Sequence, residues 1–205
     1  MKPYAFCPHC AHKLGSFQNH PGCNQETGGC GFVHWNNPIP VAATLIVFPS
    51  AEYQINVNKT FYTEMDKGFS SLARKAAREY TGILAVKRKN EPKSGEWCLP
   101  GGFVNEREDP AAAAVRETEE ESSLVVELLN QRPIIYNIEE KNETVHFYLG
   151  RPIGGDLHAG DDALEVKIYT LQDIPRLCFS SHRDMVKKWY TGELRIFKES
   201  RESFE

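Results

Sequence analysis

The sequence predicts a mixed α/β domain preceded by a small cysteine-rich module. Apolar, β-branched segments alternate along the chain with helix-forming ones, a pattern typical of a sheet covered by helices. One helical segment, residues 109–123, is rich in alanine and glutamate. Four of the six cysteines, in contrast, fall within the first 30 residues, a density typical of a metal-binding module.

Size and charge limit what the chain can be. Its 205 residues suffice for one good hydrophobic core with room for a small appended module. A net charge of −4 and a pI of about 6.0 argue against a general affinity for nucleic acid. No apolar run approaches the roughly 18 residues that a membrane span needs, and residues 1–4 do not open a signal peptide. We therefore expect a cytoplasmic protein without membrane contact, in whose reducing environment clustered cysteines bind metal.

The α/β domain is expected to contain an insertion between its first two strands. Residues 50–80 include a candidate strand at 54–57 and a helix-like stretch at 71–80. A dimer contact and an active-site flap are both open interpretations of this insertion. The predicted domains are a cysteine-rich module (1–36), the α/β domain (37–195) and a C-terminal tail (196–205). The predicted strands are 40–48, 82–88, 124–129, 134–138, 144–149 and 164–169, with a polar, glycine-rich loop at 154–162 and a final helix at 181–190.

The helix over residues 109–123 gathers acidic side chains on one face. At about 100° per residue, Glu117, Glu120 and Glu121 fall within an arc of roughly 100°. Three like charges repel each other, so the cluster needs a counterion, and hard carboxylate oxygens favour Mg²⁺, Mn²⁺ or Ca²⁺ over zinc. A solvated acidic face is the plain alternative. The neighbouring arc, expected to face the core, consists of Ala111, Val115 and Thr118.

The residues around this helix argue against a merely solvated face. Asp109 suits the N-cap and Pro110 the first helical position. Arg116 precedes Glu120 by four residues, so that it can pair with a carboxylate and hold it in position. Before the helix, residues 99–102 (LPGG) allow a tight turn and a close approach of the backbone to a ligand.

This stretch resembles the Nudix box, a fixed pattern of glycine, five residues, glutamate, seven residues, Arg-Glu, an apolar residue, any residue, Glu-Glu, any residue, glycine and an apolar residue. Two positions depart from the pattern. Thr118 replaces the aliphatic residue, and Ser123 replaces the closing glycine, so Ser123 must either adopt a left-handed C-cap or end the helix differently. The matching positions are Gly102, Glu108, Arg116, Glu117, Glu120, Glu121 and Leu124.

The resemblance implies an α/β/α sandwich with a mixed sheet and a metal-dependent pyrophosphohydrolase. Arg116 would orient a carboxylate rather than touch the substrate. Related enzymes often place a further glutamate in a later loop, which here contains Asp161, Asp162 and Glu165. Glu165 ranks first as the general base, with Glu120 as the alternative. The Mg²⁺ or Mn²⁺ ligands implied are Glu108, Glu117, Glu120 and Glu121.

The N-terminal cysteines predict a zinc ribbon, in which two pairs of cysteines converge on one structural Zn²⁺. The first pair is Cys-x2-Cys, but the second is spaced Cys-x6-Cys, so the intervening NQETGG segment must loop out. A set containing His9, His12 or His20 and a metal-free segment are the alternatives. Residues 30–41 (CGFVHWNNPIPV) also resemble the junction in Nudix hydrolases that carry such a ribbon, among them NADH, FAD and ADP-ribose pyrophosphatases. The predicted zinc ligands are Cys7, Cys10, Cys23 and Cys30.

The resemblance implies a small nucleotide as substrate, specifically a nucleoside diphosphate linked to another group. The chain lacks the SQPWPFP-type signature of NADH pyrophosphatases, which shifts weight towards ADP-ribose, FAD or a similar dinucleotide. Trp35, Phe103 and Tyr136 are candidates to stack on an adenine ring, and each is also a candidate core aromatic. The predicted substrate-binding residues are Arg88, Gly101, Gly102 and Phe103.

Two other functions were weighed against this one. A non-catalytic nucleotide-binding regulator is disfavoured because such proteins usually lose box glutamates, and all four are present here. An RNA contact through the ribbon is disfavoured because residues 1–40 contain only Lys2, Lys13 and Glu26 as charged side chains. The sequence is also compatible with a homodimer.

Overall fold

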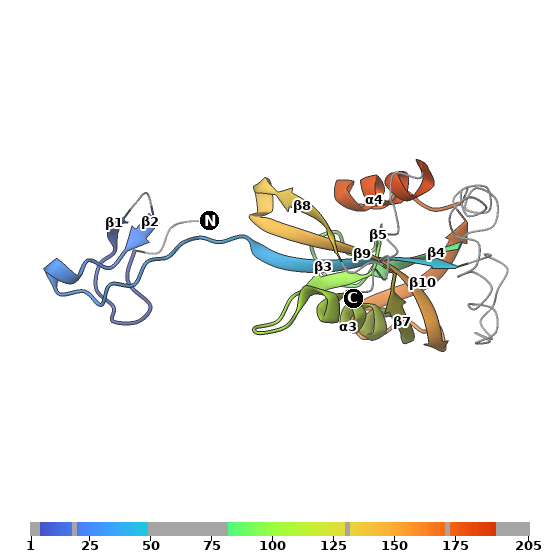
Figure 1. Ribbon diagram of the computed structural model, residues 1–205, viewed down its shortest axis with the longest axis horizontal. Helices are drawn as coiled ribbons and strands as arrows, with labels where there is room; N and C mark the ends of the chain where they lie inside the picture. The colour runs from blue at the N-terminus through green and yellow to red at the C-terminus, as the bar shows by residue number, and fades with distance from the viewer. Residues whose placement is uncertain (1–4, 18–19, 49–81, 130–131, 171–172, 192–205) are drawn as a thin grey trace, which may run out of the picture. The chain divides into compact units, whose positions relative to one another are not determined.

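The protein consists of two compact units, residues 1–38 and 39–205. The structure is a computed structural model, and it describes residues 5–17, 20–48, 82–129, 132–170 and 173–191 (Figure 1). The predicted insertion at 50–80, with its candidate strand and helix, and the predicted tail lie outside these residues. The predicted boundary between residues 36 and 37 falls just before the division between the units.

The larger unit is built on one mixed sheet. Its central strands run in the order β10-β4-β3-β9-β7, while β5, β6 and β8 pair with β4, β3 and β9 respectively. β3 and β9 are parallel, and the other pairs are antiparallel. The strands are β3 (Ile39–Phe48), β4 (Gly82–Arg88), β5 (Trp97–Cys98), β6 (Gly101–Phe103), β7 (Leu124–Leu128), β8 (Ile134–Ile138), β9 (Glu143–Gly155) and β10 (Ala163–Thr170).

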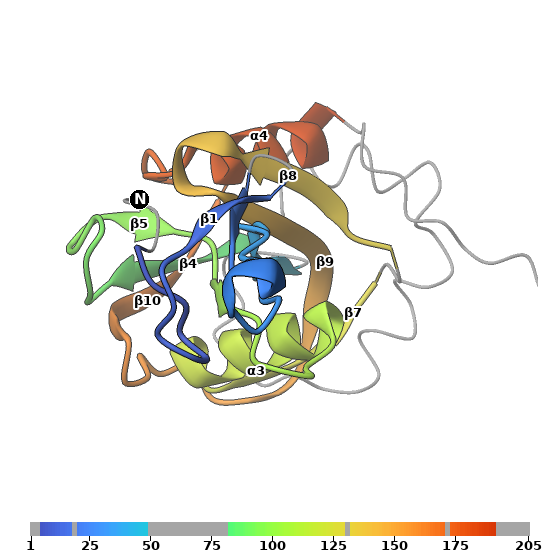
Figure 2. The same ribbon diagram turned by 90° about the vertical axis from the view of Figure 1, so that its left-hand side faces the viewer.

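Two helices cover opposite faces of this sheet, as both views show (Figures 1 and 2). Helix α3 (Pro110–Ser122) lies on one face and helix α4 (Ser180–Thr191) on the other. The alternation of side chains along β3 explains this arrangement: Leu45 packs in the core with Met185 of α4, whereas Ile46 packs on the face of α3. The predicted α/β/α sandwich with a mixed sheet is therefore confirmed.

Both ends of α3 follow from the sequence. The Asp109 carboxylate caps the start by accepting a hydrogen bond of 2.8 Å from the Ala111 N–H. Ser123 adopts the left-handed conformation (φ 60°, ψ 15°), and its N–H donates to the Glu119 carbonyl at 2.7 Å. Of the two outcomes open for Ser123, the left-handed cap is the one that occurs.

The buried face of α3 is rotated from the predicted one. Ala111 and Val115 are only partly buried, and Thr118 alone of the predicted three is fully buried. Glu121 is also buried, because backbone groups close over the end of the helix. The His158 and Gly160 N–H groups, from the loop before β10, donate to the carbonyls of Ser122 and Glu121. The buried residues are Ala113, Ala114, Thr118, Glu121 and Ser122.

The strands of the larger unit follow the prediction with two exceptions. β9 continues to Gly155, although a loop was predicted from Gly154, because its second half pairs with β7. The short strands β5 and β6 were not predicted, since two or three residues carry too little periodicity to recognise. Among the described residues, no helix is both long and apolar enough to cross a membrane.

Candidate active site and cysteine cluster

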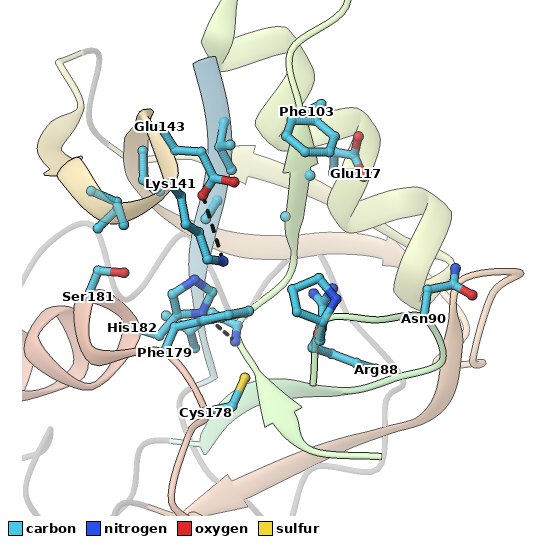
Figure 3. Close-up of a pocket in the computed structure, with 18 of the residues that line it drawn as sticks. Arg88, Asn90, Phe103, Glu117, Lys141, Glu143, Cys178, Phe179, Ser181 and His182 are labelled. Atoms are coloured by element: carbon cyan, nitrogen blue, oxygen red, sulfur yellow. Dashed lines mark hydrogen bonds and ion pairs between the residues drawn. The ribbon is translucent and has the colours of Figure 1, made fainter. Parts of the chain in front are cut away.

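A cleft of about 690 Å³ opens in the larger unit, beside the helix that carries the acidic residues. One wall consists of β6 and the carboxylates of Glu117 and Glu121 on α3. The opposite wall consists of the segment entering α4, with Phe179, Ser181 and His182, together with Lys141 from the turn between β8 and β9 (Figure 3). The cleft therefore combines an acidic wall with a basic, aromatic one.

The two glycines of β6 allow the acidic wall to form. A side chain at Gly101, which has a φ of 153°, would place its Cβ 2.4 Å from the Ala42 carbonyl oxygen. At Gly102, a Cβ would lie 2.4 Å from a carboxylate oxygen of Glu117. The Gly101 N–H donates to the Glu121 carboxylate at 3.0 Å. The glycines thus bring the backbone of β6 into contact with the glutamates of α3.

Arg116 holds three of the box carboxylates together. Its Nε and Nη2 donate to both oxygens of Glu108, at 2.7 and 2.9 Å. Its Nη1 donates to Glu117 at 2.7 Å and to Glu120 at 2.9 Å. Nη2 also donates to the Phe103 carbonyl at 3.0 Å, which ties the cluster to β6. The predicted pairing of Arg116 with Glu120 is present, but the bidentate contact with Glu108 is the more complete one.

The carboxylates facing the cleft are partly buried. Burial raises the pKa of Glu121 to about 8, against the effect of the Gly101 N–H. Burial likewise raises the pKa of Glu117, against the effect of Arg116. Glu108 differs, because its hydrogen bonds from Arg116 lower its pKa to about 2. The carboxylate oxygens of Glu117 and Glu121 form a hard-oxygen donor set, and this set fits Mg²⁺ or Mn²⁺.

The candidates for the general base lie in different places. Glu165 is on β10, where its exposed side chain pairs with the Lys87 ammonium at 3.6 Å, and it does not line the cleft. Asp162, just before β10, does line the cleft and accepts a hydrogen bond of 2.8 Å from the Asn90 side chain. Glu120 is 57% exposed and lies beside Arg116, outside the residues lining the cleft. The geometry thus favours Asp162 over Glu165.

The predicted aromatic contacts separate in the structure. Phe103 lines the cleft and is 58% exposed, as a stacking surface requires. Tyr136 lies elsewhere, with its hydroxyl donating to Asp184 at 2.6 Å and its ring against Phe147. Trp35 belongs to the smaller unit, where its ring contacts His20. The remaining predicted substrate contacts, Arg88, Gly101 and Gly102, all line the cleft.

Sequence reasoning did not identify the basic, aromatic wall. Lys141, Phe179 and His182 follow the box at a distance in the sequence and belong to no motif. The start of α4 and the turn before β9 bring them to the wall of the cleft opposite Glu117 (Figure 3). His182 is buried, and its Nδ1 accepts a hydrogen bond of 3.0 Å from the Leu99 N–H, which anchors the chain just before β6.

The smaller unit brings the four N-terminal cysteines together. Their sulfur atoms all lie within 4.8 Å of one another, and the Cys7–Cys30 and Cys10–Cys23 sulfurs are 3.5 Å apart. All four are free thiols. Four sulfurs around one tetrahedral Zn²⁺ at about 2.3 Å are separated by roughly 3.8 Å, so the cluster is compatible with a small zinc ribbon.

The unusual Cys-x6-Cys spacing is accommodated by a turn. Asn24 caps a short 3-10 helix, η1 (Gln25–Thr27), which follows the hairpin of β1 (Gly15–Phe17) and β2 (His20–Gly22). Among the described residues, the histidines considered as alternative ligands lie outside the thiol cluster. His9 and His20 contact aromatic rings, and His12 contacts Thr27.

Comparison with known proteins agrees with this geometry. The NUDIX domain family model matches residues 70–190, which is more than half of the chain. The chain belongs to the Nudix family. Nudix hydrolases generally use Mg²⁺ or Mn²⁺, consistent with the donor set of the cleft. The predicted enzyme class, a Nudix pyrophosphohydrolase, is confirmed.

Individual relatives cover different parts of the chain. An ADP-ribose pyrophosphatase from Methanocaldococcus jannaschii is 36% identical over 117 residues, covering 54% of this chain and 68% of that protein. A CMP-5'-(N-acetyl-N-hydroxy-3-aminopropyl)phosphonate hydrolase from Streptomyces rubellomurinus is 41% identical over 68 residues, 31% of each chain. The crystal structure of a Nudix hydrolase from Nitrosomonas europaea superposes with a TM-score of 0.65 at 21% identity, covering 92% of this chain and 91% of that one.

Proposed function

We propose that this Nudix protein hydrolyses, with Mg²⁺ or Mn²⁺, the pyrophosphate bond of a nucleoside diphosphate linked to another group. The products would be AMP, or another nucleoside monophosphate, and the phosphorylated remainder. The observation that carries the proposal is the placement of Glu117 and Glu121 on the wall of the cleft beside the Arg116 cluster. ADP-ribose stands first among the substrates because of the archaeal relative, with FAD and NADH-like dinucleotides next.

The residues of the cleft suit this reaction. Divalent cations would neutralise phosphate oxygens and lower the pKa of the attacking water. Glu117, Glu120 and Glu121 offer hard oxygen ligands, and Arg116 keeps the first two in place while binding Glu108. Because Arg116 makes five hydrogen bonds within the protein, it acts as a positioning residue rather than a substrate contact.

The reaction also needs an acceptor for a proton. As the water oxygen attacks phosphorus, a carboxylate takes the proton, and the bridging oxygen leaves with the other phosphoryl group. Asp162 lines the cleft and is held by Asn90, so it is better placed than Glu165 to serve as this base. Glu120 is the second candidate, since it belongs to the Arg116 cluster.

A substrate panel with paired variants tests the proposal. The wild-type protein should release AMP from ADP-ribose, FAD, NADH or diadenosine polyphosphates with Mg²⁺ or Mn²⁺, and not with EDTA. Glu120→Gln should abolish this activity without unfolding the protein, because its side chain is exposed. Glu119→Gln, at the neighbouring exposed position, is the matched control and should retain activity. Equal activity in both variants, or no hydrolysis of any compound by the wild type, would contradict the proposal.

We also propose that Cys7, Cys10, Cys23 and Cys30 bind one structural Zn²⁺. The convergence of their sulfurs supports this ligand set over one that includes histidine. The homodimer, the cytoplasmic location and the role of residues 50–80 stay predictions from the sequence.

A further inference from the structure

Phe179 lies in the cleft with two positive charges close to its ring. The Lys141 ammonium is 4.6 Å from the ring centroid, and the guanidinium carbon of Arg88 is 5.3 Å from it. The three residues come from different elements: Arg88 ends β4, Lys141 ends the short 3-10 helix η2 (Glu139–Lys141), and Phe179 immediately precedes α4. All three line the cleft (Figure 3).

The ring of Phe179 is firmly supported. It contacts the imidazole of His182 with ring centroids 5.0 Å apart. His182 is itself buried and fixed by the hydrogen bond from the Leu99 N–H. Phe179 also packs beside the cluster of Val86 and Cys98. A supported aromatic face attracts cations and restricts where they lie.

Neither charge has a close carboxylate partner in the described part of the chain. Among the residues that the structure describes, no carboxylate lies within 4.0 Å of the Arg88 guanidinium, whose Nε donates to the Pro92 carbonyl. The Glu143 carboxylate, which also lines the cleft, is 3.9 Å from the Lys141 ammonium. An aromatic ring differs from a carboxylate in that it holds a cation without cancelling its charge. Both cations therefore remain available to an anion in the cleft.

We propose that Arg88 and Lys141, positioned by Phe179, form an anion subsite for the phosphoryl group of the diphosphate that the metal site does not hold. This subsite deepens the proposed function and rests on it for the identity of the substrate. A diphosphate entering the cleft meets Glu117 and Glu121 on one wall, so it requires positive charge from the other. Arg88 can bind phosphate oxygens in a bidentate manner, whereas Lys141 acts as a point charge.

Binding of ADP in EDTA tests the subsite apart from metal chemistry. Isothermal titration calorimetry compares ADP with adenosine, which has the same base and ribose but no charge. Lys141→Met and Arg88→Met should each weaken ADP binding about tenfold, as loss of a charge-assisted contact predicts. Their adenosine binding should not change. Lys187→Met, at an exposed position of α4 outside the cleft, is the matched control and should bind ADP as the wild type does.

Phe179 is tested as a positioning residue. Phe179→Leu should weaken ADP binding several-fold, and Phe179→Tyr, which keeps an aromatic face, should restore it. In hydrolysis assays these changes should raise KM more than they lower kcat. A Phe179→Leu variant that loses adenosine binding, while Lys141→Met binds ADP normally, would make Phe179 a base-stacking surface and overturn the proposal.

The other outcomes are also decisive. ADP affinities of Lys141→Met and Arg88→Met equal to the wild type, or no ADP binding by the wild type, would overturn the subsite. The side chain of Lys141 is 39% exposed, so its charge reversal, Lys141→Glu, provides a second folded variant and should weaken ADP binding further. If ADP binding responds as expected but no substrate is hydrolysed, the subsite stands and the proposed function fails.

Discussion

The hydroxyl groups of Thr44 on β3 and Thr118 on α3 form a hydrogen bond of 2.7 Å in the core. Both residues are fully buried, and the Thr118 hydroxyl also bonds the Ala114 carbonyl at 2.7 Å. Thr118 is the position at which the Nudix box normally has an aliphatic residue. The departure is therefore matched by a polar partner on the sheet.

This pair predicts an asymmetric loss of stability. Thr118→Val removes the partner of the buried Thr44 hydroxyl and should lower the free energy of unfolding by about 1–3 kcal/mol. Thr44→Val should lower the free energy of unfolding less, because the Thr118 hydroxyl can still donate its hydrogen bond to the Ala114 carbonyl. The double variant should be more stable than the sum of the single losses implies. Chemical denaturation measures all three, and strictly additive losses would contradict a coupling between the hydroxyls.

Replacing the two glycines of β6 should have different effects, one on stability and the other on activity. Gly101→Ala forces a Cβ against the backbone of β3, so it should lower the free energy of unfolding by about 1–3 kcal/mol. Gly102→Ala instead meets the flexible carboxylate of Glu117. It should leave the melting temperature nearly unchanged and reduce metal-dependent turnover about 10–100-fold. Full activity in a folded Gly102→Ala variant would show that the position of Glu117 is unimportant.

Replacing the acidic residues around the start of β10 should separate catalysis from surface charge. Asp162→Asn removes a carboxylate from the cleft and should lower kcat about 10²–10⁴-fold if it is the general base. Glu165→Gln breaks only an exposed ion pair with Lys87 and serves as the control, with activity close to the wild type. The reverse ranking in steady-state kinetics would restore Glu165 as the base.

His182 should make the protein less stable in mild acid. Burial lowers the pKa of its imidazole to about 3, and the charges of Arg88, Lys141 and Arg183 act in the same direction. In the unfolded chain a histidine has a pKa of about 6.5. Between pH 6.5 and about pH 3, the His182 imidazole is protonated in the unfolded state but not in the folded state.

His182 therefore does not lower the free energy of unfolding above pH 6.5, and it lowers this free energy progressively as the pH falls below 6.5. The expected slope is about 1.4 kcal/mol per pH unit. Glu121, whose pKa is raised by burial, favours the folded state as the pH falls and so acts in the opposite direction, which means that the contribution of His182 is the difference in slope between two variants measured by denaturation between pH 7 and pH 5. His182→Asn, whose amide oxygen can accept from the Leu99 N–H, should lose the part of the slope that His182 contributes, and the exposed His158→Asn should keep it. An unchanged slope in His182→Asn would place the pH dependence elsewhere.

Metal analysis tests the cysteine cluster. The purified protein should contain about one zinc per chain, and Cys23→Ser should lose most of it, because a structural site needs four ligands. Chelation should also expose the N-terminal unit to protease. Cys178→Ser, outside the cluster, is the control and should keep its zinc. Protein without zinc that still resists protease would contradict the metal site.

The sequence by itself determined the parts of this protein that depend on short-range spacing. The helix from Asp109 to Ser123, its caps and the box glutamates follow from the order of residues along one helix. The long strands follow from apolar, β-branched runs such as that of β3. The cysteine cluster follows from the four cysteines in the first 30 residues. These features require only local propensity and periodicity, which the sequence states directly.

The tertiary structure decided which side chains face the cleft. The helical period placed Glu117, Glu120 and Glu121 on one arc, but only the packing of α3 under β6 and the loop before β10 buried Glu121. The register of β10 turned Glu165 towards Lys87, leaving Asp162 at the cleft. The basic wall around Phe179 arises from contacts between residues distant in sequence, which no local pattern encodes. Spacing therefore identified the chemistry, and packing selected the residues that can carry it out.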